Sequence, residues 1–251
     1  MQKLMLILML VSLVIALSAQ TYSLEMEQQA EAGDAGYQTD LGLCYYHGYG
    51  IDQSYENAVY WWRLAADQGY ADAQHNMGIC YESGNGVAKD YKEAVKWYRL
   101  AADQNQPLSQ NNLGVCYDFG NGVEMNHETA VSWYRRSADL GCSDGQYNLG
   151  NSYYDGKGIA QDYAEAAKLY ELAANQGHAG AANNLGICYQ DGLGVIKDLE
   201  TAYFWYLVAS ELGDENAGGN IDAIYDYLSD EEIEYAEEDF YYWLDEYEGY
   251  Y

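Results

Sequence analysis

The chain has 251 residues, with 40 aspartates and glutamates against 11 lysines and arginines, and its formal net charge is −29 at pH 7. A surface this negative repels phosphate groups, so the composition argues against nucleic acids and anionic membrane surfaces as partners. It favours basic partners, loosely bound divalent cations or solubility alone.

The first predicted element is a secretory signal peptide over residues 1–19. Lys3 precedes an apolar run over residues 4–16, and the small residues Ser18 and Ala19 follow it. The run is short for a bilayer span, which leaves an uncleaved membrane anchor as the alternative. Cleavage would give an exported chain (secreted, periplasmic or in an endomembrane lumen) without stable membrane insertion. That chain would have 10 basic and 40 acidic residues, a net charge of −30.

A fixed period of 36 residues follows a partial helix within residues 20–34. A large apolar residue before a glycine recurs without insertion, as Leu41-Gly42, Met77-Gly78, Leu113-Gly114, Leu149-Gly150 and Leu185-Gly186. The period divides residues 35–214 into the units 35–70, 71–106, 107–142, 143–178 and 179–214. A period of this length predicts an all-α solenoid of stacked helix-turn-helix repeats.

Each unit carries the signals that end one helix and begin the next. A first helix of about 13 residues ends at a Gly-x-Gly turn such as Gly48-Tyr49-Gly50 or Gly192-Leu193-Gly194. A polar residue that can cap the second helix then follows, at Ser54, Asp90, Asn126, Asp162 and Asp198. Because the turn recurs between two helices in every unit, it indicates structure rather than phosphate binding.

Small and aromatic residues recur in phase on both helices of each unit. The second helices carry alanines at Ala58, Ala94, Ala130, Ala166 and Ala202, and tryptophans at Trp61, Trp97, Trp133 and Trp205. The first helices carry Tyr45, Tyr81, Tyr117, Tyr153 and Tyr189. Repetition at one phase favours packing between hairpins over a sugar-binding or stacking role.

Four of the five cysteines share one repeat position, namely Cys44, Cys80, Cys116 and Cys188, with Ser152 in the remaining unit. Neighbouring helices pack about 8–10 Å apart, whereas a disulfide needs Cα atoms closer than about 7 Å. We therefore expect these four to be small buried residues without bridges. Cys142 lies in an inter-repeat loop, where it is either a reactive thiol or an inert one.

Residues 215–251 are predicted to hold a half repeat and an acidic capping helix. A sixth first helix covers about residues 214–228, and Ser229 with Glu232 forms a capping box for a final helix. Its apolar stripe consists of Ile233, Ala236, Phe240, Trp243, Leu244 and Tyr247. No lysine or arginine follows Lys197, while residues 198–248 contain 17 acids. The helix should cover the open end of the solenoid, and a docking role is the alternative.

The repeat resembles a known family. Residues 71–102 contain Ala-x-Ala-Gln-x-Asn-Met-Gly-x-Cys-Tyr-x-x-Gly-x-Gly-Val and then Ala-x-x-Trp-Tyr-x-x-Ala-Ala. This pattern looks like the SEL-one-like repeat (SLR), a relative of the tetratricopeptide repeat, and it extends over about residues 30–228. The resemblance implies a right-handed α/α superhelix whose first helices line a concave face. It also implies an adaptor or scaffold role, without common catalytic residues.

One candidate binding column precedes the Leu-Gly pairs: Asp40, Asn76, Asn112, Asn148, Asn184 and Asn220. In the related tetratricopeptide pattern the matching asparagine faces the groove, and its amide can bind a peptide backbone. The alternative is that each asparagine ties its helix to a neighbouring inter-repeat turn.

Variable positions on the same helices are candidates for specificity. One column consists of Thr39, His75, Asn111, Tyr147 and Asn183, a second of Tyr46, Glu82, Asp118, Tyr154 and Gln190, and a third of His47, Ser83, Phe119, Asp155 and Asp191. Their aromatic and acidic groups suit a basic or mixed peptide, although an ordinary solvated face is the alternative. The predicted partner-binding residues are His75, Asn76, Glu82, Asn111, Asn112, Asp118, Phe119, Tyr147, Asn148, Tyr154, Asn183 and Asn184.

The sequence predicts no catalytic residues, metal site or cofactor. The four histidines lack metal-ligand spacing, and no nucleophile motif is present. The predicted function is an exported scaffold for protein or peptide partners. The alternative is a binder or hydrolase of β-lactam-like cell-envelope compounds, as implied by a cysteine-rich secreted branch of the family. That branch has two bridged cysteines per repeat, whereas this chain has one.

Overall fold

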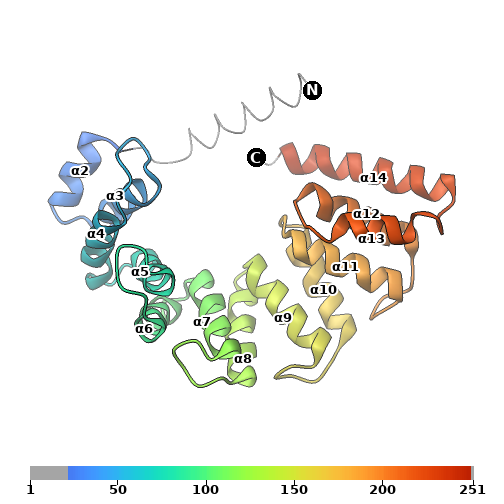
Figure 1. Cartoon of the computed structure of the whole chain (residues 1–251), viewed down its shortest axis with the longest axis horizontal. Helices are drawn as coiled ribbons and strands as arrows, with labels where there is room; N and C mark the ends of the chain where they lie inside the picture. The colour runs from blue at the N-terminus through green and yellow to red at the C-terminus, as the bar shows by residue number, and fades with distance from the viewer. Residues whose placement is uncertain (1–21, 250–251) are drawn as a thin grey trace. The chain divides into compact units, whose positions relative to one another are not determined.

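The computed structural model describes residues 22–249, which contain helices and no strands (Figure 1). The predicted signal peptide lies outside these residues. The described part divides into two compact units, residues 22–109 with 121–123 and residues 110–120 with 124–249. No helix within the described part is both long and apolar enough to cross a membrane. The predicted all-α repeat fold is confirmed.

The helices alternate between the first and second helix of each repeat. The first unit contains α2 (Leu24–Glu31), α3 (Ala35–His47), α4 (Tyr55–Asp67), α5 (Ala71–Ser83) and α6 (Tyr91–Ala102). α7 (Pro107–Phe119) begins at the boundary, and the second unit continues with α8 (His127–Asp139), α9 (Ser143–Asp155), α10 (Tyr163–Ala174), α11 (Ala179–Asp191), α12 (Leu199–Glu211), α13 (Ala217–Tyr225) and α14 (Asp230–Gly249). The helices from α2 to α6 pack consecutively in the first unit, and those from α8 to α13 do so in the second.

The predicted caps of the second helices are confirmed. Each of the five polar residues accepts a hydrogen bond from a backbone N–H in the first turn: Ser54, Asp90, Asn126, Asp162 and Asp198. Asp162, for example, accepts from the amides of Ala164 and Glu165 at 3.0 and 3.1 Å. These caps satisfy N–H groups that a helix start leaves without an intrahelical acceptor.

The glycine of each Leu-Gly pair makes room for a ring from the second helix of the same repeat. A Cβ atom on Gly150 would lie 2.8 Å from Cε1 of Tyr170. The matching rings, all nearly fully buried, are Trp62, Tyr98, Tyr134, Tyr170 and Tyr206. Trp61, Trp97 and Trp133, one residue earlier on their helices, are only half-buried. Trp62 and the four tyrosines therefore fill the centre of the hairpins, while Trp61 and Trp97 of the predicted tryptophan column pack against the core clusters.

The second glycine of the inter-helix turn allows contact with the preceding repeat. Gly158 and Gly194 both have φ of 74°, a conformation that side chains disfavour. A Cβ atom on Gly158 would collide with the backbone of His127, and one on Gly194 with that of Tyr163. Each turn thus packs directly on the start of the preceding second helix.

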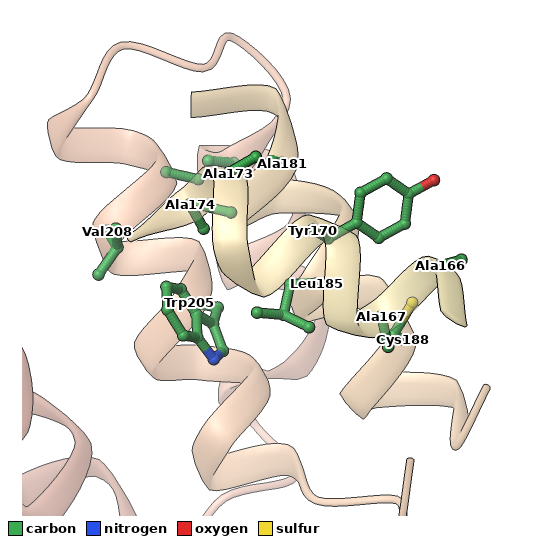
Figure 2. Close-up of a cluster of buried hydrophobic side chains, with 13 residues drawn as sticks. Ala166, Ala167, Tyr170, Ala173, Ala174, Ala181, Leu185, Cys188, Trp205 and Val208 are labelled. Atoms are coloured by element: carbon green, nitrogen blue, oxygen red, sulfur yellow. The ribbon is translucent and has the colours of Figure 1, made fainter. Parts of the chain in front are cut away.

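The core of the last repeats consists largely of alanines around a few larger side chains (Figure 2). Ala173, Ala174 and Ala181 are fully buried together with Leu185, Cys188 and Val208. The predicted burial of the four in-phase cysteines is confirmed. Burial raises the pKa of the Cys80 thiol to about 12. The pKa of Cys188 is raised to about 11, mainly by burial and then by the nearby charge of Asp191. Cys142 is half-buried.

The final helix packs on α12. The side chains of Phe240 and Trp243 lie against the core cluster of Figure 2, and Ala236 is buried in a second cluster with Ala202 and Tyr206. The rings of Trp243 and Tyr247 stack with centroids 4.8 Å apart. The capping box is formed, because Glu232 accepts from the amide of Ser229 and its own amide donates to the hydroxyl of Ser229.

Candidate partner-binding face of the first helices

Three members of the asparagine column link successive first helices. Asn148 donates from Nδ2 to Oδ1 of Asn111 at 2.8 Å, and Asn184 donates to Oδ1 of Asn151 at 3.1 Å. Asn220 donates in the same way to Oδ1 of Asn183 at 2.7 Å. The acceptors are side chains of the preceding first helix and not inter-repeat turns. Each amide is half-buried, so part of its hydrogen-bonding capacity faces solvent.

The column that begins at Thr39 is largely buried, which corrects the expectation of a solvent-facing position. His75, Asn111 and Asn183 are 7%, 5% and 6% exposed. The imidazole Nδ1 of His75 lies 2.8 Å from the hydroxyl of Ser109, and burial lowers its pKa to about 4. Each of these residues comes one position before a member of the asparagine column, so its side chain is turned by about 100° around the helix from that asparagine. In this direction the side chains face the next repeat. These three residues are therefore closed to a partner.

Tyr147 is the half-buried member of that column. Its ring stacks on the imidazole of His178, with centroids 4.3 Å apart. His178 caps α11 by accepting from the amide of Ala181, and burial lowers its pKa. Tyr147 therefore helps to hold the start of α11.

The column that contains Glu82 and Asp118 is half-buried and supports the central rings. Tyr98 donates its hydroxyl to Oε2 of Glu82 at 2.6 Å, and Tyr206 donates to Oε1 of Gln190 at 2.7 Å. Asp118 has other partners on its repeat edge. Its carboxylate lies 2.7 Å from Nδ1 of His127 and 3.2 Å from Nζ of Lys157.

Two hollows in the second unit bring predicted residues together. The first, with a volume of about 250 Å³, lies between α7 and α9 and is lined by Val115, Asp118, Phe119, Tyr134, Asn148, Asn151, Ser152, Asp155 and Lys157. The second, of about 200 Å³, lies between α9 and α11 and is lined by Asn151, Tyr154, Asp155, Tyr170, Asn184 and Ile187. Both share Asn151 and Asp155. We call the side chains that line these hollows the first-helix face.

The exposed groups of this face are one aromatic ring, one carboxylate and one ammonium, those of Phe119, Asp155 and Lys157. Phe119 is 67% exposed, and the ammonium of Lys157 lies 5.6 Å from its ring centroid. Asp155 is exposed and forms no ion pair among the residues that the structure describes. Burial, followed by nearby ionisable groups that include Asp191 and Asp155, raises the pKa of Tyr154. The predicted Asn76 and Glu82 lie on α5 in the first unit, outside both hollows, and Asn112 on α7 lines neither of them.

Asn151 was missed in the sequence, although a signal was present. The matching residues in the other repeats are apolar, namely Leu43, Ile79, Val115 and Ile187. Oδ1 of Asn151 accepts from the hydroxyl of Tyr170 at 2.7 Å and from Nδ2 of Asn184 at 3.1 Å. A single polar residue in an apolar column could therefore have identified the position that joins the two hollows.

Within residues 22–249, no cluster of three or more histidine, cysteine, aspartate or glutamate side chains could hold a metal ion.

Comparison with known proteins identifies the repeat. The model of the Sel1 repeat matches residues 35–70, 71–106, 107–142, 143–178 and 179–214, the units that the period predicts. A protective antigen present in uropathogenic Escherichia coli strains, which displays an SLR fold, is 37% identical with a TM-score of 0.75, and the match covers 81% of this chain and 44% of the antigen. A Sel1 repeat protein from Oxalobacter formigenes is 34% identical with a TM-score of 0.72, over 77% of both chains.

A more distant likeness is one of fold alone. An immunity protein from Pseudomonas aeruginosa is 22% identical with a TM-score of 0.51, over 73% of this chain and 67% of that one. The chain spans less than half the length of the Escherichia coli antigen, and no curated protein matches it. Sel1 repeat proteins are in general scaffolds for protein–protein interaction. With five matched repeats over residues 35–214, the chain belongs to the Sel1 repeat family.

Proposed function

We propose that the chain is an exported, non-enzymatic scaffold that binds an extended segment of a partner protein along the first-helix face. The supporting observation is the pair of adjacent hollows that share Asn151 and Asp155. Hollows on neighbouring repeats should lie one helix spacing apart, about 8–10 Å. A peptide in the polyproline II conformation has three residues per turn and rises about 3.1 Å per residue. Side chains three residues apart then lie on one face about 9 Å from each other and can enter both hollows.

The polar groups of the face suit a peptide backbone. Asn148 and Asn184 each use one N–H on the preceding helix, and the remaining N–H and the carbonyl oxygen can pair with a peptide amide. Phe119 offers an exposed aromatic contact, and aromatic residues are enriched among the strongest contributors to protein interfaces. The carboxylate of Asp155 favours a basic or mixed segment.

The proposal is tested with the chain lacking residues 1–19 as bait for affinity capture from the envelope and secreted fractions of its source. A captured protein is then titrated against two double variants. Phe119→Ala with Asp155→Asn changes the first-helix face. Leu172→Ala with Asp139→Asn is the control, because it changes an exposed leucine and an exposed acid elsewhere in the second unit.

Only the first pair should weaken capture, with both melting temperatures unchanged. Equal capture by both variants would contradict binding at this face. Export is tested separately, because the intact mass of the protein recovered from outside the cytoplasm should lack residues 1–19.

A further inference from the structure

A third hollow lies between α12 and α14, on a different part of the second unit. It has a volume of about 220 Å³ and is lined by Glu200, Thr201, Phe204, Trp205, Ala236 and Asp239. It exists because α14 packs on α12. No residue of the first-helix face contributes to it.

Two aromatic side chains form the apolar wall of this hollow. The rings of Phe204 and Trp205 meet edge to face, with centroids 4.9 Å apart. Trp205 is 7% exposed and belongs to the core cluster, and Phe204 is partly buried against it. The repeat does not demand an aromatic at Phe204, since the matching residues are Tyr60, Lys96, Ser132 and Lys168. The same edge-to-face pair occurs in the first repeat, as Tyr60 and Trp61 with centroids 5.1 Å apart, but not in the other three repeats.

Two carboxylates at the hollow lack a counter-charge. Neither Glu200 nor Asp239 has an ion pair or a side-chain hydrogen bond within residues 22–249. The neighbouring acids are engaged. Asp198 accepts from the amides of Glu200 and Thr201, and Glu232 accepts from Ser229. The two lining carboxylates are thus the ones left for a ligand.

The charged groups that act on Glu200 are all acidic. Burial, and after it the charges of Asp198, Glu232, Asp239 and Glu231, raise the pKa of Glu200. The sequence contains no lysine or arginine after Lys197 that could neutralise them. A cation supplied by another molecule would relieve this repulsion.

We propose that this hollow binds an arginine side chain of a partner polypeptide. A guanidinium is planar, so it can stack on an aromatic ring while its N–H groups pair with carboxylates. Its methylene stem would contact Phe204, and its N–H groups would reach Glu200 and Asp239. Lysine offers a compact and strongly hydrated charge that does not stack in this way.

The test uses the chain lacking residues 1–19 and three capped tripeptides, Gly-Arg-Gly, Gly-Lys-Gly and Gly-Gln-Gly. The readout is the indole N–H signal of Trp205 in ¹H–¹⁵N spectra, identified through Trp205→Phe. The arginine peptide should shift this signal saturably at physiological ionic strength. The lysine peptide should bind about tenfold more weakly, which corresponds to roughly 1.4 kcal/mol, and the glutamine peptide should not bind.

Matched variants separate local pairing from overall charge. Glu200→Gln with Asp239→Asn should abolish the shift, whereas Glu234→Gln with Glu238→Gln removes the same charge from exposed positions of α14 and should preserve it. Equal loss in both variants, an equal response to the lysine and arginine peptides, or no saturable shift would each overturn the proposal. Phe119→Ala with Asp155→Asn should leave the shift unchanged, so failure here is distinguishable from failure at the first-helix face.

Discussion

At the scale of the residue, the repeat depends on a contact between one glycine and one ring. The absence of a Cβ on Gly150 lets the ring of Tyr170 approach the backbone of α9, and Tyr170 in turn donates to Asn151. The same contact recurs 36 residues later between Gly186 and Tyr206. Glycine is unfavourable inside a helix, but here it is needed because the tyrosine ring occupies the space that a Cβ atom would fill.

Gly150→Ala should therefore destabilise the protein by about 1–3 kcal/mol, since overpacking forces the ring out of its position. Urea denaturation measures the change. The control is Gly219→Ala on α13, where nothing lies within 4 Å of the added Cβ. If the two substitutions had the same effect, the glycine–ring contact would not determine stability.

Another recurring contact joins two glutamines within one repeat, one just after the second helix and one on the first helix. Gln104 donates to Gln74 at 2.8 Å, and Gln176 donates to Gln146 at 2.7 Å. In the third repeat Leu140 occupies the donor position. Leu140→Gln should place a donor near Gln110 and raise stability by about 0.5–1.5 kcal/mol.

Leu140 is 50% exposed, so its removal exposes little new apolar surface. Leu172→Gln is the control, because Leu172 is equally exposed and outside this set of glutamines. A gain in Tm of similar size in both variants would contradict the role of the glutamine pair.

His75 makes stability depend on pH. Burial lowers its pKa to about 4 from an ordinary value near 6.5, so the unfolded chain binds the proton first. Its contribution to stability is therefore present above about pH 6.5 and is lost as the pH falls toward 4. His75→Asn, the residue of the next repeat, should remove this loss. Urea denaturation of both proteins between pH 4 and pH 6.5 measures the free energy of unfolding. If the wild type and the variant lost the same stability over this range, His75 would not be responsible.

At the scale of the element, much of the structure was predictable and the orientation of side chains was not. The units, the helix caps and the apolar stripe of α14 were predictable because turns, caps and amphipathic periods are local signals. Burial of Asn111 beside half-buried Asn112 was not, since one step turns a side chain by about 100°. Which of the two faces the next repeat depends on how the helices cross, and sequence spacing does not supply that angle.

The packing of α14 can be tested through its aromatic stripe. Trp243→Ala should destabilise α14 by about 2 kcal/mol, less than for a fully buried ring because Trp243 is half-buried. Hydrogen exchange should accelerate across Asp230–Gly249, while α9 and α10 remain protected. Tyr241→Ala, at a position 62% exposed, should leave exchange unchanged. Equal protection in both variants would show that the stripe does not hold the helix.

At the scale of the whole molecule, charge is poorly balanced. The ion pairs between a lysine and an acid within the described residues are Lys96–Glu93, Lys157–Asp118 and Lys168–Glu165. The whole sequence contains 40 acidic residues. Repulsion among the remaining carboxylates opposes the folded state and is screened by salt.

Added sodium chloride should therefore raise the Tm, and the gain should level off once the Debye length falls below the spacing of surface charges. Differential scanning calorimetry measures it, with sorbitol as an uncharged control that acts on hydration alone. A Tm that falls with salt would mean that ion pairs outweigh repulsion.

The turn glycines have a consequence for how such chains change length. Gly158 packs on the start of α8 and Gly194 on the start of α10 through the same backbone contact. Excision of residues 143–178 would bring Gly194 onto His127, where Gly158 now packs, and Asn184 into the place of Asn148. Recombination between repeats can thus add or delete a repeat without requiring a new type of contact between its neighbours. The hollows that this repeat lines are gained or lost together with it.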